Sequence, residues 1–174
     1  EIPAQHPDYE RQIADFYMRS ADDLSGLLRQ GKSVGLLAEG DPFFYGSFMH
    51  MWRRLEGDFP VEVVPGVTGM SGCWTATGQP ITWGDDVLTV LMGTLPEAEL
   101  ARHMADTDAL VVMKIGRNID KVRRALETAG RMDRAWLVEY ATMPGQKVMR
   151  LAEVEGRVTP YFSIVLVHGQ GRRP

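Results

Sequence analysis

The sequence has too few cysteines for a disulfide framework or a structural zinc site. Cys73 is the only cysteine among 174 residues, and the four histidines show no metal-ligand spacing. Small secreted domains rely on paired cysteines, and structural zinc sites need clustered cysteine and histidine ligands. We therefore expect no bound metal and a protein of the reducing cytoplasm.

Membrane and nucleic-acid signals are also missing. No apolar run approaches the roughly 20 residues that a helix needs to cross a bilayer. The first residues lack the basic-plus-apolar pattern of a signal peptide. The formal net charge is −4, so bulk charge does not favour nucleic-acid binding. We expect a small-molecule ligand, with no membrane and no nucleic acid as partners.

Common catalytic patterns are absent as well. The sequence has no GxSxG nucleophile elbow and no phosphate loop that ends in Gly-Lys-Ser or Gly-Lys-Thr. Asp85 and Asp86 are adjacent, so on a strand they point to opposite faces, and we interpret them as a solvated linker. A reaction accelerated mainly by holding two reactants in line, an effect worth roughly 7–11 kcal/mol, needs no such groups.

The sequence does contain short apolar runs that alternate with helical patterns. Strand-length runs occur at residues 33–38, 61–64, 87–92, 109–113, 134–139, 147–151 and 161–167. Helix-face spacing occurs at residues 13–28, 48–55, 68–76, 97–105 and 119–129. This alternation predicts the α/β class. We expect a mostly parallel sheet in the first half and a mixed sheet in the second, where strands follow one another closely.

The stretch at residues 79–86 (QPITWGDD) predicts a junction between two domains, 1–83 and 84–174. The chain opens on a helical pattern, and no strand precedes residues 33–38. Parallel sheets seldom begin this way. We therefore expect the first domain to be incomplete, with an N-terminal part outside this sequence.

The loop at residues 39–45 (EGDPFFY) is the first candidate binding site, because ligands of parallel sheets lie beyond the carboxyl ends of the strands. Gly40 lets the backbone turn sharply against a ligand, and Pro42 makes the loop rigid. Asp41 can accept hydrogen bonds from backbone N–H groups or face a cationic ligand. A plain turn between a strand and a helix is an equally weighted alternative.

A helical pattern rich in small residues follows the Pro65-Gly66 turn. Each glycine inside a helix costs about 1 kcal/mol relative to alanine, so the glycines of this helix need a reason. Close approach to a ligand and tight packing of the helix on a sheet both supply one, and the two can hold together. The helix start at Thr68 also offers free N–H groups and a positive dipole end.

The sequence contains four segments that resemble the tetrapyrrole (corrin/porphyrin) methylases: AEGDPFFYGSF, VEVVPGVTGMSG, VLTVLMGTLPEAEL and EYATMPGQKVMRLAE. They occur in the family's order and cover nearly the whole chain. The resemblance implies two α/β domains with S-adenosylmethionine folded in the cleft between them, a tetrapyrrole above it, and a homodimer. The glycine-rich GxGPGDP-type motif that opens the family pattern has no counterpart here.

The resemblance also implies particular cofactor contacts. They fall at Glu39, Gly40, Asp41, Phe44, Thr68, Gly69, Ile115, Ala141, Tyr161 and Ser163. Backbone donors at Thr68 and Gly69 suit the carboxylate or hydroxyl groups of the methyl donor. Apolar Phe44 and Ile115 suit its adenine or methionyl chain. For Ile115, a purely structural place in the core stays an alternative.

The implied reaction moves a methyl group from sulfur to a nucleophilic meso carbon of a reduced macrocycle, followed by proton loss. Tyr45 and Glu139 are the candidate bases. The substrate carboxylates call for cations. Candidates for that role are Arg53, Arg54, Lys114, Arg117 and Lys147.

Three alternatives stay open at this point. The chain could methylate another tetrapyrrole carbon, or it could bind cofactor or tetrapyrrole without turnover. A weaker alternative treats Gly40–Pro42 as a nucleotide-phosphate loop, and the absence of a lysine after the glycine argues against it.

Overall fold

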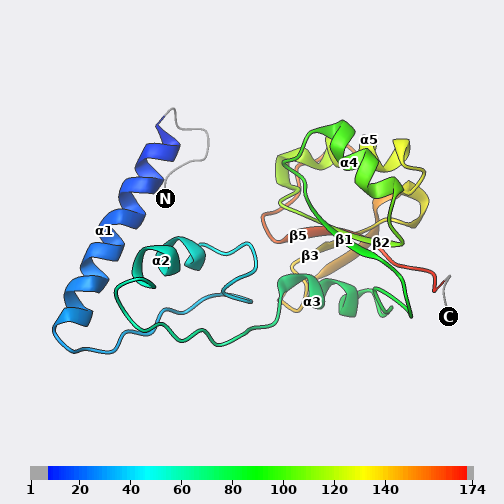
Figure 1. The fold of residues 1–174 in the computed structure, drawn as a ribbon. Helices are drawn as coiled ribbons and strands as arrows, with labels where there is room; N and C mark the ends of the chain where they lie inside the picture. Colours follow the sequence, from blue (N-terminus) through cyan, green and yellow to red (C-terminus); the bar gives the residue numbers. More distant parts are fainter. Residues whose placement is uncertain (1–7, 172–174) are drawn as a thin grey trace. The chain divides into compact units, whose positions relative to one another are not determined.

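The computed structural model describes residues 8–171. The chain divides into two compact units, Glu1–Thr68 and Gly69–Pro174 (Figure 1). The first unit holds helices α1 (Tyr9–Arg29) and α2 (Phe48–Leu55). These helices pack on each other through a small apolar cluster. The cluster consists of Ala21, Met51 and Leu55, with Tyr17, Leu24 and Phe59 packed against it. The interface between α1 and α2 therefore buries few apolar side chains.

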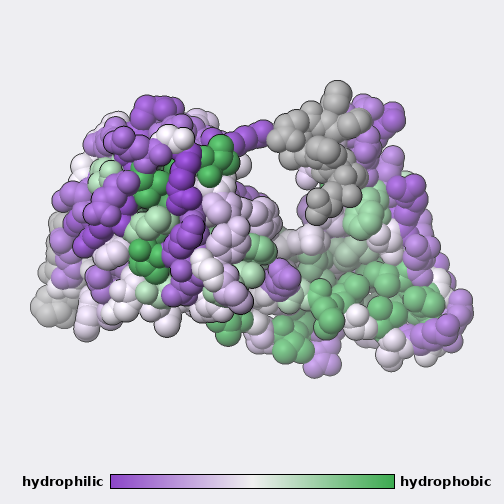
Figure 2. Space-filling view, turned by 180° about the vertical axis from the view of Figure 1, so that it is seen from behind, coloured by the Kyte–Doolittle hydropathy of each residue, from purple (hydrophilic) through white to green (hydrophobic). Residues whose placement is uncertain are grey.

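Two strand predictions fail in the first unit. Residues 33–38 and 61–64 form neither helix nor strand, and neither belongs to a sheet in the described part of the chain. A strand exists only as part of a hydrogen-bonded ladder, and periodicity cannot supply the partner. Several of their apolar side chains are exposed, and Figure 2 shows hydrophobic side chains gathered on the surface of this unit. The exposed set is Val34, Leu36, Leu37, Val61 and Val64, with Val67 beyond the second segment.

The second unit is built on a five-stranded sheet with the order β1-β2-β5-β3-β4. The strands are β1 (Leu88–Met92), β2 (Ala109–Met113), β3 (Trp136–Glu139), β4 (Lys147–Arg150) and β5 (Ser163–Val167). β1 and β2 are parallel, while β5 runs antiparallel to β2 and to β3, and β4 antiparallel to β3. The mixed sheet predicted for the second half is therefore confirmed, and with it the α/β class.

Helices cover both faces of this sheet, as Figure 1 shows. α4 (Glu97–Ala105) and α5 (Ile119–Thr128) lie over one face, and α3 (Gly69–Ala76) lies over the other. Alternate residues of β2 serve the two layers: Leu110 and Val112 face α4 and α5, whereas Val111 faces α3. Burial on both faces explains why β2 is continuously apolar. Short 3-10 turns lie at Gly116–Asn118, Met132–Arg134 and Leu151–Glu153.

The division into compact units falls between Thr68 and Gly69, because α3 packs on β3 and β5 of the second unit. The domain boundary expected between residues 83 and 84 stays a prediction. The predicted junction at residues 79–86 also packs here, since Ile81 is buried in the layer under α3. The Asp86 carboxylate accepts hydrogen bonds from the N–H groups of Trp83 and Gly171, at 3.0 and 3.1 Å.

Within residues 8–171, no helix combines the length and apolarity needed to span a bilayer. The same residues contain no group of three or more histidine, cysteine or acidic side chains placed to hold a metal ion.

His168 ties the end of β5 to the segment after α3. Its Nδ1 lies 2.9 Å from the carbonyl oxygen of Pro80, and its Nε2 lies 2.9 Å from the hydroxyl of Thr77. Burial lowers the pKa of His168 from 6.5; the hydrogen bond to Pro80 opposes this effect, and the charge of Arg150 adds to it. The ring is therefore easier to protonate in the unfolded chain than in the folded protein.

We predict that stability falls as the pH is lowered through about 6.5 and below, because protons bind the unfolded chain preferentially there. Urea unfolding at pH 7.5 and pH 5.5 measures the change. His168→Gln should weaken this pH dependence, whereas His103→Gln, on the exposed face of α4, should leave it as in the parent protein. Equal pH dependence in all three proteins would contradict the assignment to His168.

Candidate functional site

The carboxyl ends of three strands meet at one edge of the second unit's sheet. Because β4 and β5 run the other way, their first residues lie at the same edge. We call this the carboxyl edge; it is formed by Met92, Met113, Glu139, Lys147 and Ser163 and by the turns that follow or precede them. The edge is where ligands of parallel strands bind.

The turns at this edge contain left-handed backbone at residues other than glycine. Lys114 follows β2 with φ 53°, and Tyr140 and Thr142 follow β3 with φ 50° and 61°. Within residues 8–171 the one further case is Tyr45, φ 53°, in the predicted loop of the first unit. Such conformations cost of order 1–3 kcal/mol each and cluster at functional sites. All four residues lie in segments where the sequence predicted ligand contacts.

The turn after β2 carries Ile115, a predicted cofactor contact. Its side chain is 1% exposed and belongs to the core beneath α4 and α5, as the structural alternative expected. Only its backbone can face a ligand at the edge. Gly93, which follows β1, lies tightly against this turn: an added Cβ would be 3.0 Å from the Lys114 oxygen and 3.1 Å from the Ile115 Cα. Sequence reasoning missed Gly93, and its place directly after an apolar strand was the available signal.

The turn after β3 carries Ala141, the next predicted contact. The N–H of the strained Thr142 donates to Oε1 of Gln146 at 2.7 Å, which holds the turn in place. Gly72 of α3 packs beneath it, since an added Cβ would lie 3.2 Å from the Thr142 methyl. Packing thus explains this helical glycine, whereas an added Cβ at Gly69 would meet nothing within 4 Å.

Tyr161 and Ser163, at the start of β5, differ sharply in exposure. Tyr161 is 89% exposed and its ring lies 5.2 Å from that of Phe162, which in turn lies 6.2 Å from Tyr140. These three aromatic rings form a cluster at the carboxyl edge. Ser163 is buried, and its hydroxyl has no hydrogen-bond partner among the described residues. Of the two predicted contacts, only Tyr161 presents its side chain to solvent.

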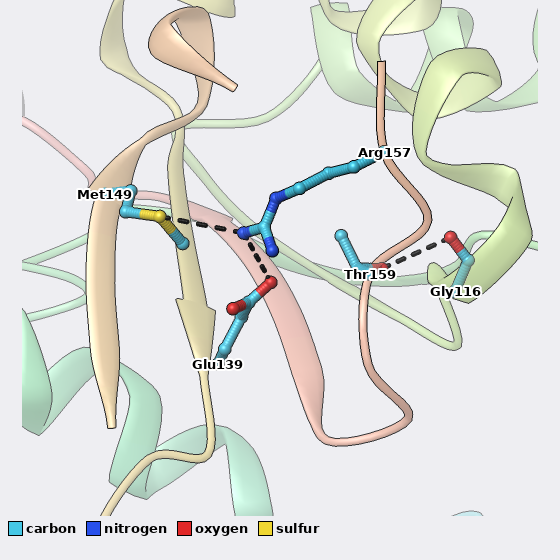
Figure 3. A network of polar contacts seen from close by, with 5 residues as sticks. All are labelled: Gly116, Glu139, Met149, Arg157 and Thr159. Carbon is cyan, nitrogen blue, oxygen red and sulfur yellow. Dashed lines mark hydrogen bonds and ion pairs between the residues drawn. The ribbon is translucent and has the colours of Figure 1, made fainter. Parts of the chain in front are cut away.

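Glu139, one of the two candidate bases, ends β3 and is fully buried. Its Oε1 accepts a hydrogen bond from Nη2 of Arg157 at 2.7 Å, and Nη2 also lies 3.7 Å from the Met149 sulfur (Figure 3). Its Oε2 has no hydrogen-bond partner within the described part of the chain. The hydroxyl of Ser163, the residue paired with Glu139 on the neighbouring strand β5, also lacks one there. This geometry suits a residue that positions others; a role as base stays a prediction.

The five candidate cations are distributed over both units. Lys114, Arg117 and Lys147 lie at the carboxyl edge, in the turn after β2 and at the start of β4. Arg53 and Arg54 lie on α2 of the first unit, where Arg54 donates to the carbonyl oxygen of His50 at 2.7 Å. The edge therefore combines cations, exposed aromatic rings and strained backbone, which together can bind a flat, negatively charged molecule.

In the first unit, the predicted loop is held by Asp41. One carboxylate oxygen accepts the N–H of Phe43 and the other that of Gly66, both at 2.9 Å. This is the first of the two roles considered for Asp41. The turns after residues 33–38 and 61–64 are in close contact, since an added Cβ at Gly66 would lie 2.2 Å from the Gly40 oxygen.

The other predicted contacts of this unit lie near that clamp or at the unit's end. Phe44 donates its N–H to the carbonyl oxygen of Asp41, and its ring lies 4.9 Å from the ring of Tyr45. Glu39 begins the same loop, and Thr68 is the last residue of the unit.

Comparison with known proteins gives consistent matches. A family model described as Tetrapyrrole (Corrin/Porphyrin) Methylases matches residues 4–155. The chain is 52% identical over 174 residues to a precorrin-2 C(20)-methyltransferase from Sinorhizobium sp, covering 100% of this chain and 71% of that protein. It is 44% identical over 169 residues to the cobalamin biosynthesis protein CobIJ of Mycobacterium tuberculosis, covering 97% of this chain but 33% of the longer protein.

A solved structure shares the fold. Uroporphyrin-III C-methyl transferase from Thermus thermophilus, complexed with S-adenosyl homocysteine, superposes with a TM-score of 0.62 at 26% identity. The match covers 90% of this chain and 72% of that one.

We predict that Gly66→Ala destabilises the first unit by about 1–3 kcal/mol, because the new methyl group collides with backbone at Gly40. Hydrogen exchange of the peptides spanning residues 39–67 measures the local opening. Gly35→Ala is the matched control, since its Cβ would meet nothing within 4 Å. If both variants exchange alike, the clamp between the two turns is not the constraint inferred here.

Proposed function

Because the chain belongs to the tetrapyrrole (corrin/porphyrin) methylases, we propose that it methylates carbon 20 of precorrin-2, forming precorrin-3A in cobalamin biosynthesis. The observation that carries the proposal is the 52% identity, over all 174 residues, to a protein named for this reaction. The 44% identity to a cobalamin biosynthesis protein supports the same pathway. This chain covers 71% of the length of that relative.

The proposed methyl donor is S-adenosylmethionine, which supplies an electrophilic methyl group on a sulfonium sulfur. A related structure at 26% identity holds S-adenosyl homocysteine, the product that remains after transfer. The carboxyl edge has the chemical groups that such a molecule needs. It offers backbone polar groups in the strained turns, and it offers exposed aromatic rings. At Ile115 and Ser163, whose side chains are buried, the proposed contact is through the backbone.

The remaining proposed cofactor contacts are those that the family resemblance implies, and they are distributed over both units. Glu39, Gly40, Asp41, Phe44 and Thr68 are in the first unit. Gly69, Ala141 and Tyr161 are in the second. Asp41 contributes indirectly, because both of its oxygens already accept backbone N–H groups and fix the loop.

The chain's contribution to the reaction is positioning. Transfer forms a bond from the nucleophilic carbon to the methyl group while the methyl–sulfur bond breaks, and the sulfur keeps the electron pair. Holding the reacting atoms in line can supply roughly 7–11 kcal/mol of the barrier, so no nucleophilic side chain is required. Lys114, Arg117 and Lys147 bind substrate carboxylates, and Arg53 and Arg54 are further candidates in the first unit. Tyr45, whose ring is half exposed, and Glu139 stay the two candidates for proton removal.

We further propose a homodimer that acts in the cytoplasm. Support comes from the family resemblance for the dimer and from the single, buried Cys73 for a reducing compartment. Sedimentation analysis of the protein tests the first part.

The direct test is incubation with purified precorrin-2 and S-adenosylmethionine labelled in the methyl group. We expect one labelled methyl group per tetrapyrrole, at carbon 20, identified by nuclear magnetic resonance of the product. Calorimetry with S-adenosylhomocysteine accompanies it. Binding without transfer would favour a non-catalytic module, and label at another carbon would assign a different member of the family.

We predict that Lys147→Gln raises KM for the tetrapyrrole about tenfold, because a hydrogen bond between charged groups is lost. Affinity for S-adenosylhomocysteine should stay as in the parent protein. Arg124→Gln, at an exposed position of α5, is the matched loss of one positive charge and should change neither value. An equal rise in KM for both variants would indicate only a general effect of net charge.

A further inference from the structure

A segment without helix or strand connects the last 3-10 turn to β5 and crosses the carboxyl edge. We call residues 155–162 the strap. Its ion pair joins Arg157 to Glu139, and its Thr159 hydroxyl donates to the carbonyl oxygen of Gly116 at 3.2 Å (Figure 3). At its end, the carbonyl oxygen of Phe162 accepts the N–H of Tyr140 at 2.8 Å. The strap is thus fastened to the turns after β2 and β3.

Burial alternates along the strap. Thr159 is buried and the Arg157 head reaches a fully buried carboxylate, whereas Val158 and Tyr161 are exposed. The strap therefore has anchoring side chains that point inward and other side chains that face solvent at the edge. Its position depends on the anchors, because a loop without regular structure has few backbone hydrogen bonds of its own.

We propose that Glu139 and Arg157 are a positioning pair, which holds the strap on the carboxyl edge and so fixes the Tyr140 turn and the approach to Tyr161. The proposal rests on the proposed function, since it concerns the edge where cofactor contacts are assigned. Glu139 is the residue before the left-handed Tyr140, whose N–H binds the other end of the strap. The ion pair and this hydrogen bond thus attach the strap to two consecutive residues at the start of the turn.

Stability alone does not explain the choice of these residues. Apolar residues of similar size are often as stabilising as a buried ion pair, because charges lose water when they are buried. Around the pair, Oε2 of Glu139 and the hydroxyl of Ser163 also lack partners among the described residues, which adds cost. What a guanidinium and a carboxylate add is direction, since a planar donor holds its acceptor at a fixed angle.

The test separates the effect of the ion pair on the position of the strap from its effect on stability. Arg157→Met leaves a buried carboxylate without its partner and should lower the melting temperature, whereas Glu139→Leu leaves the Arg157 side chain, which is 38% exposed, and should lower it less. The double variant removes both charges and should recover most of that loss. If the pair positions the strap, the double variant still shows faster hydrogen exchange at residues 155–162, about tenfold weaker binding of S-adenosylhomocysteine, and up to about a hundredfold lower kcat/KM.

The matched control is the exposed pair Arg124–Glu97, whose Nη2–Oε2 distance is 2.8 Å. Its double variant, Glu97→Leu with Arg124→Met, should leave strap exchange and cofactor affinity unchanged. Arg157→Lys keeps the charge without the planar head, and should lose cofactor affinity while retaining most of the melting temperature. This variant keeps the test decisive if the double variant fails to fold.

The proposal would be overturned if the Glu139→Leu/Arg157→Met protein, or the Arg157→Lys protein, kept the parent's rate of hydrogen exchange in the strap and the parent's affinity for S-adenosylhomocysteine. The two proposals can fail separately. If the parent protein binds S-adenosylhomocysteine but does not methylate precorrin-2, the proposed function fails, while exchange and cofactor affinity still decide the role of the pair.

Discussion

The carboxyl edge depends on backbone strain that buried strands hold in place. Lys114 and Tyr140 adopt left-handed conformations directly after β2 and β3. A free chain would relax such residues, but β2 is buried on both faces and pairs with β1 and β5 along its length. Packing in the interior therefore fixes the turns, and the turns define where a ligand meets the sheet.

Local contacts complete what the strands begin. Gly93 allows the turn after β2 to lie within van der Waals contact of the end of β1, and Gln146 accepts the N–H of Thr142. Across the edge, Arg157 and Thr159 fasten the strap to both turns. A reaction that needs little help from an acid, a base or a nucleophile depends mainly on how the reactants are positioned. At the carboxyl edge, these contacts hold the turns in place.

Periodicity and motifs predicted much of the second unit from sequence. All five strands and the helices α4 and α5 lie where the apolar patterns placed them, with ends shifted by at most two residues. The residues named after β2 and β3 do gather at one edge, because both strands run antiparallel to β5 and therefore end on the same side of the sheet. The failures have physical causes. Residues 33–38 and 61–64 have the pattern of strands, but pairing depends on a neighbour that no pattern encodes. Neither the strain at Tyr140 nor the Arg157–Glu139 pair is visible in sequence, since both arise from contacts between distant segments.

The most direct test of the carboxyl edge as the ligand site is a crystal structure of the protein with S-adenosylhomocysteine. We expect the bound molecule to contact the backbone at residues 114–116 and 140–142, with Tyr140 and Thr142 still left-handed. A molecule bound elsewhere on the second unit, with these turns relaxed to ordinary φ values, would contradict it.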